Sequence, residues 1–339
     1  MDPSTGLDAT SAARGFASSH EQQENATTQA TQTPQQVATP VGIPTQETPP
    51  SLQLPPQQQY SISTAFHADF LLDDSIPDVV LISSDHVLFY AHQTFLLSAS
   101  DNHFAGLLDI DAIGTVAGST AGSLSVVVPT GSTLFNVVLH TIYGLSCQQF
   151  QPPLDVLLQA VQTLKTFGIA VDQFLARDTP LYDHIVAESP PVPIEVFLVA
   201  AEHKLDALAV ATSAHLHSLV LSQVTDEMAE RMGPTYFKRL MSLHLERTGY
   251  LGKLLMVAPT HHEDTAECGK AQRKEFDQAW ALAVGNLMWT VRPDIPADEL
   301  RSTLSSIEQH AKCNECKRSL HARVHDIVVN WSTNAKQTI

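Results

Sequence analysis

A short C-terminal stretch, HAKCNECKRSLHARVH (310–325), carries thiols and imidazoles at spacings that metal sites use. Cys313 and Cys316 form a C-x2-C pair, His321 follows after four residues, and His325 follows after three more. Thiolate and imidazole are ligands that zinc prefers, and C-x2-C-x4-H opens a zinc knuckle. These four side chains are therefore the first candidates for metal chemistry.

The surrounding pattern argues against one ion held by all four side chains. The stretch 304–331 keeps apolar residues at helical spacing and has no glycine for a knuckle turn. On a continuous helix, a rise of about 1.5 Å per residue puts Cys313 and His321 about 12 Å apart. One ion binds its ligands at about 2.0–2.3 Å and cannot reach both. Either pair could supply two ligands if two more came from elsewhere. We therefore expect no bound metal or other cofactor, and two free or buried thiols.

A second polar cluster places His261, His262, Glu263 and Asp264 side by side. Such side chains can bind hard or borderline metals. A proline and a glycine bracket the cluster, which is more typical of a solvated loop. Together with the C-terminal thiols and histidines, it defines an alternative hypothesis, a zinc-stabilised domain or a metal-dependent enzyme.

No pattern supports nucleophilic catalysis. A triad could be written from Ser98, His92 and Asp78, but the chain has no G-x-S-x-G elbow and no Gly-rich oxyanion turn beside these serines. It also has no P-loop, no dinucleotide fingerprint and no H-E-x-x-H motif. We expect that the protein is not an enzyme and that His92 has a structural role.

Strands and then helices must position these residues. DVVLISS (78–84) is rich in β-branched residues and HVLFYAH (86–92) follows closely, which predicts a hairpin; LSVVVP (124–129) predicts another strand. Apolar residues recur at helical spacing from residue 93 onward and again in DNHFAGLL (101–108). Further helical segments are predicted at 131–144, 154–169, 193–210 and almost throughout the remainder, with breaks at 233–237, 258–269 and 292–299.

Composition divides the chain and limits its partners. Residues 1–64 are dominated by Gln, Thr, Pro, Ser and Ala, which predicts a disordered tail. The net charge is −17, and residues 65–224 contain three bases against sixteen acids. Because phosphate binding needs clustered Lys and Arg, nucleic acid and acidic membrane surfaces are disfavoured partners.

The sequence also indicates where in the cell the protein is located. No apolar run of 18 or more residues predicts a membrane span, and the polar N-terminal residues do not resemble a signal peptide. With four cysteines in such a chain, we expect an intracellular protein with reduced thiols. The nucleus and the cytosol remain equally open.

The order of these elements resembles a BTB/POZ domain of fungal type over about residues 68–175. An Asp-Val step opens the first strand, a hydrophobic-Ala-His step ends the second, and a Phe-containing segment, a strand with a final Pro and a helix with a final Tyr-Gly step follow. The matching positions are Asp78, Val79, Ala91, His92, Leu97, Ser100, Phe104, Pro129, Tyr143 and Gly144. The resemblance implies an α+β fold: a small sheet flanked by helices at 65–178, then an all-helical extension at 190–339.

The resemblance also assigns roles to the motif residues. Asp78 and His92 are expected to lie close together under the helices of the domain and to satisfy one another's hydrogen bonds. Ser100, Phe104, Tyr143 and Gly144 complete the expected structural motif. The family usually has Lys or Arg after the histidine, whereas this chain has Gln93, which weakens a corepressor-binding role.

The implied function is protein–protein interaction. BTB-like domains often form homodimers through an N-terminal segment, which here would be residues 65–75. Some are substrate adaptors that bind a cullin scaffold of a ubiquitin ligase through a hydrophobic-x-Glu motif. Its counterpart here is Leu107-Leu108-Asp109, where Asp replaces Glu. The apolar residues of the expected dimer segment are Phe66, Phe70, Leu71 and Leu72.

Overall fold

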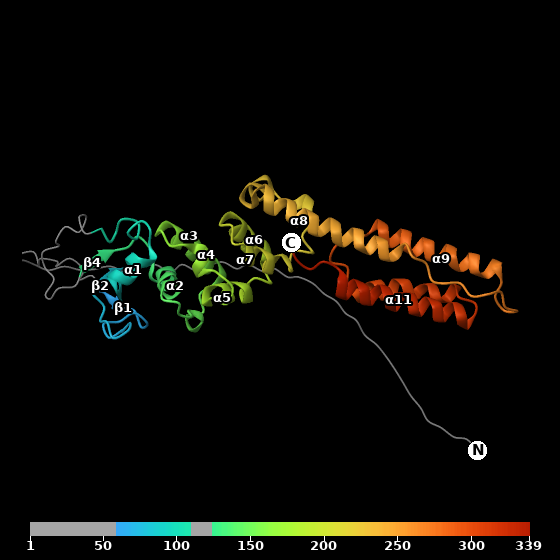
Figure 1. Ribbon diagram of the computed structural model, residues 1–339, viewed down its shortest axis with the longest axis horizontal. Helices are drawn as coiled ribbons and strands as arrows, with labels where there is room; N and C mark the ends of the chain where they lie inside the picture. Colours follow the sequence, from blue (N-terminus) through green and yellow to red (C-terminus); the bar gives the residue numbers. More distant parts are fainter. Residues whose placement is uncertain (1–58, 110–123) are drawn as a thin grey trace, which may run out of the picture. The chain divides into compact units, whose positions relative to one another are not determined.

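The computed structural model describes residues 59–109 and 124–339 (Figure 1). Residues 110–123 and nearly all of the predicted tail lie outside the described residues. The described chain has a small mixed sheet in its first part and helices after it, which confirms the α+β class and the helical C-terminal part.

Four short strands form the sheet in the order β1-β3-β2-β4. The predicted hairpin is confirmed, because β2 (Val79–Ile82) pairs antiparallel with β3 (Val87–Ala91). The predicted third strand, β4 (Leu124–Val127), runs parallel to β2. Strand β1 (Ser61–Ile62) runs parallel to β3 and lies inside the predicted tail. The predicted tail boundary at residue 64 is therefore too late.

Helices make up most of the rest. The apolar period that predicted them survives in their buried faces, such as Leu157, Val161 and Leu164 of α3. The helices are α1 (Gln93–Ala99), α2 (Ser132–Ile142), α3 (Leu154–Thr166), α4 (Val171–Phe174), α5 (Pro180–Glu188), α6 (Pro193–Glu202), α7 (Asp206–Ser213), α8 (Asp226–Leu255), α9 (Lys270–Trp289), α10 (Ala297–Ser305) and α11 (Asn314–Asn334). Short 3-10 turns are η1 (Gln148–Phe150), η2 (Leu221–Gln223) and η3 (Ser306–His310).

The segment 101–108 departs from its helical pattern. His103, Phe104 and Ala105 have φ values of 53°, 60° and 57°, so the chain makes a left-handed turn there. Ser100 explains the turn, since its hydroxyl donates to the Phe167 carbonyl at 2.6 Å and accepts the Phe104 N–H at 2.7 Å. The turn buries the Phe104 ring, which stacks on Phe167 with ring centroids 4.2 Å apart. These contacts with Phe167, which is distant in sequence, therefore determine the backbone of 101–108, and the helical spacing of its apolar residues does not.

Two hydrophobic cores are present in the described residues. The first extends from Phe66 through the sheet and α2–α7 to Leu240 in α8, and the second from Leu251 to Ala335. The predicted domain boundary between residues 178 and 190 therefore lies inside the first core and does not separate the two cores. The transition from the first core to the second falls within α8: its first half packs in the first core and its last turns pack in the second. The second core is made by α8, α9, α10 and α11.

Candidate metal centre

Four potential metal ligands meet in the second core. The ligand atoms of His262, Cys268, Cys313 and Cys316 all lie within 4.8 Å of one another. His262 Nε2 is 3.2 Å from Cys313 Sγ and 3.3 Å from Cys316 Sγ, and the Sγ atoms of Cys268 and Cys316 are 3.8 Å apart. Three sulfurs and one imidazole nitrogen therefore form one compact cluster.

The three separations given for individual atom pairs suit a tetrahedral zinc ion. Zn–S bonds of about 2.3 Å at tetrahedral angles place two sulfurs about 3.8 Å apart, and a nitrogen at about 2.0–2.1 Å lies about 3.5 Å from each sulfur. The Cys268–Cys316 separation equals the first value, and the two S···N separations fall slightly below the second. A set of three thiolates and one imidazole is a common structural zinc set.

The start of α11 positions two of the sulfurs. The helical turn η3 ends at His310, and Cys313 is the N-cap of α11, with extended backbone. The Cys316 N–H donates to Cys313 Sγ at 3.4 Å, so the C-x2-C pair wraps the first turn. A helix N-terminus favours negative charge, which suits thiolates. The predicted continuous helix over 304–331 is wrong, because the chain leaves helical geometry at 311–313.

The loop between α8 and α9 supplies the other two ligands. Cys268 directly precedes Gly269, the N-cap of α9, and closes a turn in which its N–H donates to Thr265 Oγ1 at 3.1 Å. His262 Nδ1 lies 2.6 Å from the Glu263 carbonyl oxygen. Because a carbonyl oxygen can only accept, Nδ1 donates in this bond, and Nε2 is the nitrogen that faces the sulfurs. Metal-binding histidines are usually oriented by such a bond to the other ring nitrogen.

Further bonds hold this loop in place. Arg273 of α9 donates to the His262 carbonyl at 2.6 Å and forms an ion pair with Asp264. The Ser319 hydroxyl of α11 donates to the Thr260 carbonyl at 2.7 Å. The loop is thus fastened both to the helix that follows it and to the helix that carries the C-x2-C pair.

The three thiols are buried and differ in acidity. Cys268, Cys313 and Cys316 are 1%, 7% and 4% exposed. Burial raises the pKa of Cys313, but hydrogen bonds from the Cys316 N–H and from the Cys316 and Cys268 thiols outweigh it and lower this pKa to about 7. Burial, and then the adjacent Cys313 sulfur, raise the pKa of Cys316 to about 12 and also raise that of Cys268. Cys313 is therefore the most acidic of the three thiols.

Sequence spacing identified half of this cluster. Cys313 and Cys316 are brought together, whereas His321 is exposed and pairs with Glu308 at 3.1 Å, and His325 is exposed on α11. The two remaining ligands do come from elsewhere in the chain. His262 belonged to the polar cluster noted in the sequence; Cys268 was missed. Its only local signal is a position just before a helix, which Cys313 shares.

His92 is buried as expected, but its partners differ from the prediction. Its side chain is 3% exposed, with Nδ1 3.1 Å from the Tyr143 hydroxyl and Nε2 3.0 Å from the Ser75 carbonyl oxygen. Asp78 is exposed and instead accepts the N–H of Gln93, the first residue of α1, at 2.7 Å. The predicted Asp78–His92 pair is wrong, because the carboxylate caps the helix that begins beside the imidazole.

The other motif residues lie at a helix end and in turns. Tyr143 and Gly144 end α2, and Gly144 has a positive φ of 66° that glycine adopts without strain. Ser100 and Phe104 form the left-handed turn described above. Asp109 of the expected cullin-facing motif lies 2.6 Å from His103 Nδ1, and Leu107 is half-buried.

The expected dimer segment is largely occupied within its own chain. Phe66 is fully buried and packs against Phe89, His140 and Tyr143, so it already has a place in the first core. Phe70 is half-buried against Phe66 and Tyr143. Leu72 is also half-buried, which leaves Leu71 as the exposed member of the predicted set. Phe66 and Phe70 of this segment therefore contribute to the first core of their own chain.

No family model, no curated protein and no solved structure matches this chain. Among the described residues, none of the helices combines the length and apolar character needed to cross a membrane.

Proposed function

We propose that this chain is a protein-interaction scaffold whose C-terminal helices are fastened by a structural zinc ion. The observation that carries the zinc assignment is the convergence of three cysteines and one histidine within 4.8 Å. Four protein ligands complete a tetrahedral shell, whereas catalytic zinc sites keep one position for water or substrate. A zinc-stabilised domain is therefore favoured over a metal-dependent enzyme.

The ion would join segments that are distant along the chain. His262 and Cys268 precede α9, whereas Cys313 and Cys316 begin α11. When bound, zinc supplies a crosslink between these segments and keeps all three thiols deprotonated. This matters for the second core, because its buried residues are spread over four helices and include the three cysteines themselves.

The α+β part of the chain supports an interaction role of BTB type. The hairpin β2–β3, the parallel strand β4 and the buried His92 at the end of β3 agree with the order of elements in the resembling family. On this proposal the chain is not an enzyme, its partners are proteins, and a cullin scaffold is one candidate through Leu107 and Asp109. Self-association stays a prediction.

Elemental analysis of the purified full chain tests the zinc assignment. We expect about one zinc per chain, and a fall in both helical content and Tm when a strong chelator removes it, since zinc binding is coupled to folding. His262→Ala should lose the ion, while His261→Ala should keep it. His261 is the matched control because it is the adjacent histidine, and its Nε2 lies 3.5 Å from Asp277 instead of facing the sulfurs.

Two results would contradict the assignment. One is a well-folded protein without metal that holds a disulfide between Cys268 and Cys316. The other is zinc that His262→Ala and His261→Ala retain equally.

A further inference from the structure

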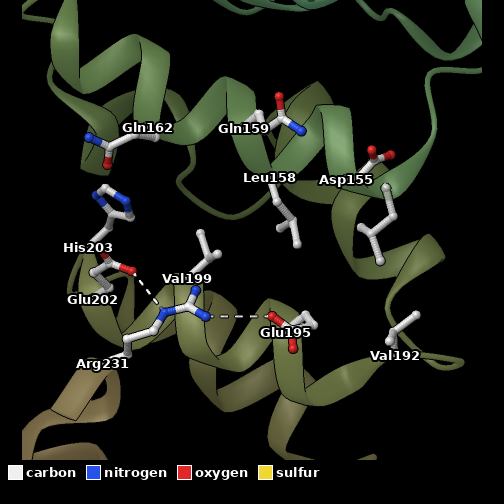
Figure 2. A pocket seen from close by; sticks show the side chains of 11 residues that line it. Asp155, Leu158, Gln159, Gln162, Val192, Glu195, Val199, Glu202, His203 and Arg231 are labelled. Carbon is white, nitrogen blue, oxygen red and sulfur yellow. Dashed lines mark hydrogen bonds and ion pairs between the residues drawn. The ribbon is translucent and has the colours of Figure 1, made fainter. Parts of the chain in front are cut away.

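We propose that the groove between α3 and α6 binds a basic, amphipathic helical segment of a partner protein. The inference rests on the interaction role proposed above and assigns that role a surface and a partner chemistry. Figure 2 shows the groove, with side chains of α3 on one side, side chains of α6 on the other, and Arg231 of α8 reaching in. Its volume is about 540 Å³.

The apolar lining comes from both helices. Leu154 and Leu158 are one turn apart on α3, and Val199 of α6 and Val192 just before α6 face them. Leu154, Leu158 and Val199 are half-buried against the first core, and Val192 is 44% exposed. An apolar strip between two helices suits the apolar face of a third helix, which presents anchors at i, i+3 or i+4, and i+7.

The charged lining is mainly acidic. Asp155 of α3 and Glu195 and Glu202 of α6 lie along the groove, against the single cation Arg231. The lining also contains His203. Burial, and then the charge of nearby Lys165, lower the pKa of this histidine, so it adds little positive charge at neutral pH. The lining therefore carries an excess of negative charge.

Two of these carboxylates already bind a basic side chain, that of Arg231. Its guanidinium lies 3.7 Å from Glu195 and 3.4 Å from Glu202, which are two helical turns apart on α6. The dashed lines in Figure 2 mark both ion pairs. All three side chains are between 33% and 52% exposed, so each pair is weak and an incoming Lys or Arg can compete for the carboxylates.

The charge of the groove favours a segment of another protein as its occupant over segments of this chain. Residues 1–64 contain one base, Arg14, against five acids, and residues 65–224 contain three bases against sixteen acids. Several arginines of the C-terminal part already pair with acids of their own chain, including Arg239 of α8 with Asp206, and Arg292, between α9 and α10, with Glu299. A separate, basic protein segment complements the groove better than the N-terminal segment or a second copy does.

A display selection with randomised helical peptides tests the proposal on the full chain. We expect enriched peptides to combine apolar residues at helical spacing with Lys or Arg. Fluorescence anisotropy with the enriched peptides should show about a tenfold or larger loss of affinity for Leu158→Asp and for Val192→Asp. The Val192 variant guards against misfolding, since this side chain is more exposed. The double variant Glu195→Gln, Glu202→Gln should weaken binding several-fold and reduce its salt dependence.

The matched control is Leu282→Asp, which places the same charge on an exposed leucine of α9. It should bind the peptides as the natural chain does. Enrichment of acidic peptides, no enrichment at all, or equal binding to the Leu158→Asp, Val192→Asp and control proteins would overturn the proposal. So would a homodimer lost only in the groove variants, or competition by a peptide of residues 45–58, because these assign the groove to the chain itself. Zinc content is measured on the same preparations, so failure of the groove is separable from failure of the zinc site.

Discussion

His92 shows how a residue with catalytic chemistry is used for structure. Both ring nitrogens are engaged, Nδ1 with the Tyr143 hydroxyl and Nε2 with the Ser75 carbonyl oxygen. Ser98, the nucleophile of the conceivable triad, donates instead to the Phe95 carbonyl at 2.7 Å. The imidazole thereby connects the end of β3 to the end of α2 and to the segment that precedes β2.

Replacing His92 by Ala should destabilise the first core by about 1–3 kcal/mol, because the substitution removes a buried imidazole and its contacts with the Tyr143 hydroxyl and the Ser75 carbonyl oxygen. Urea unfolding measures the change. The control is His325→Ala, which removes an exposed imidazole of α11 and should alter stability by less than about 0.5 kcal/mol. Equal stability of the two variants would show that the His92 contacts contribute nothing.

Cys268 is the ligand that separates a zinc centre from an isolated C-x2-C pair. Cys268→Ser should lose most of the bound zinc and lower the Tm by several degrees, because three ligands hold the ion less tightly and the crosslink to α11 is weakened. Cys147→Ser is the matched control, since Cys147 is also a buried, free thiol but lies in the first core. Elemental analysis and thermal unfolding report the two effects. Zinc retained fully by Cys268→Ser would exclude this residue as a ligand.

At the scale of elements, helix α8 is interrupted at one glycine. Gly233 has φ 64° and ψ 169°, which interrupts the helix just before Pro234. Side chains rarely tolerate that conformation. Gly249 lies in the regular part of the same helix, where an added Cβ meets nothing within 4 Å. The two glycines therefore have opposite roles.

Gly233→Ala should destabilise the protein by about 1–3 kcal/mol through backbone strain, whereas Gly249→Ala should stabilise it by about 0.4–1 kcal/mol by restricting the unfolded chain. Chemical unfolding of both variants gives the comparison. The same sign of change for both would mean that the break at Gly233 is absent in solution.

Element types were predictable from the sequence because apolar residues recur with the period of the element that buries them. The hairpin β2–β3 and helix α3 follow their patterns closely. Residues 101–108 do not, since the Ser100 and Phe104 contacts with Phe167 lie outside any local window. Cys268 escaped for the same reason: it meets Cys316 from 48 positions away, and only tertiary packing brings them together.

At the scale of the whole molecule, several histidines of the described residues are buried or half-buried: His140 and His244 are buried, and His203 and His217 are half-buried. Burial is the main cause that lowers the pKa of His140, His203, His217 and His244 below the usual 6.5. The unfolded chain therefore binds more protons than the folded chain below pH 6.5. Their contribution to stability is present above that pH and is lost as the pH falls through the folded-state pKa values.

We accordingly expect the free energy of unfolding to be lower at pH 5.5 than at pH 7.5. His140→Gln should reduce this difference, because one buried titrating group is removed from the first core while the zinc ligands remain. Urea titrations at the two pH values, on the natural chain and the variant, give the comparison. An identical pH dependence in both would show that His140 does not contribute.

The second core contains the three cysteines of the proposed zinc site, whereas the first core contains none of its ligands. X-ray absorption at the zinc edge of the purified full chain tests this most directly, since it identifies the ligands of the bound metal. We expect three sulfurs at about 2.3 Å and one nitrogen at about 2.0–2.1 Å. A shell of oxygen and nitrogen without sulfur, or a folded protein that binds no zinc, would contradict this expectation.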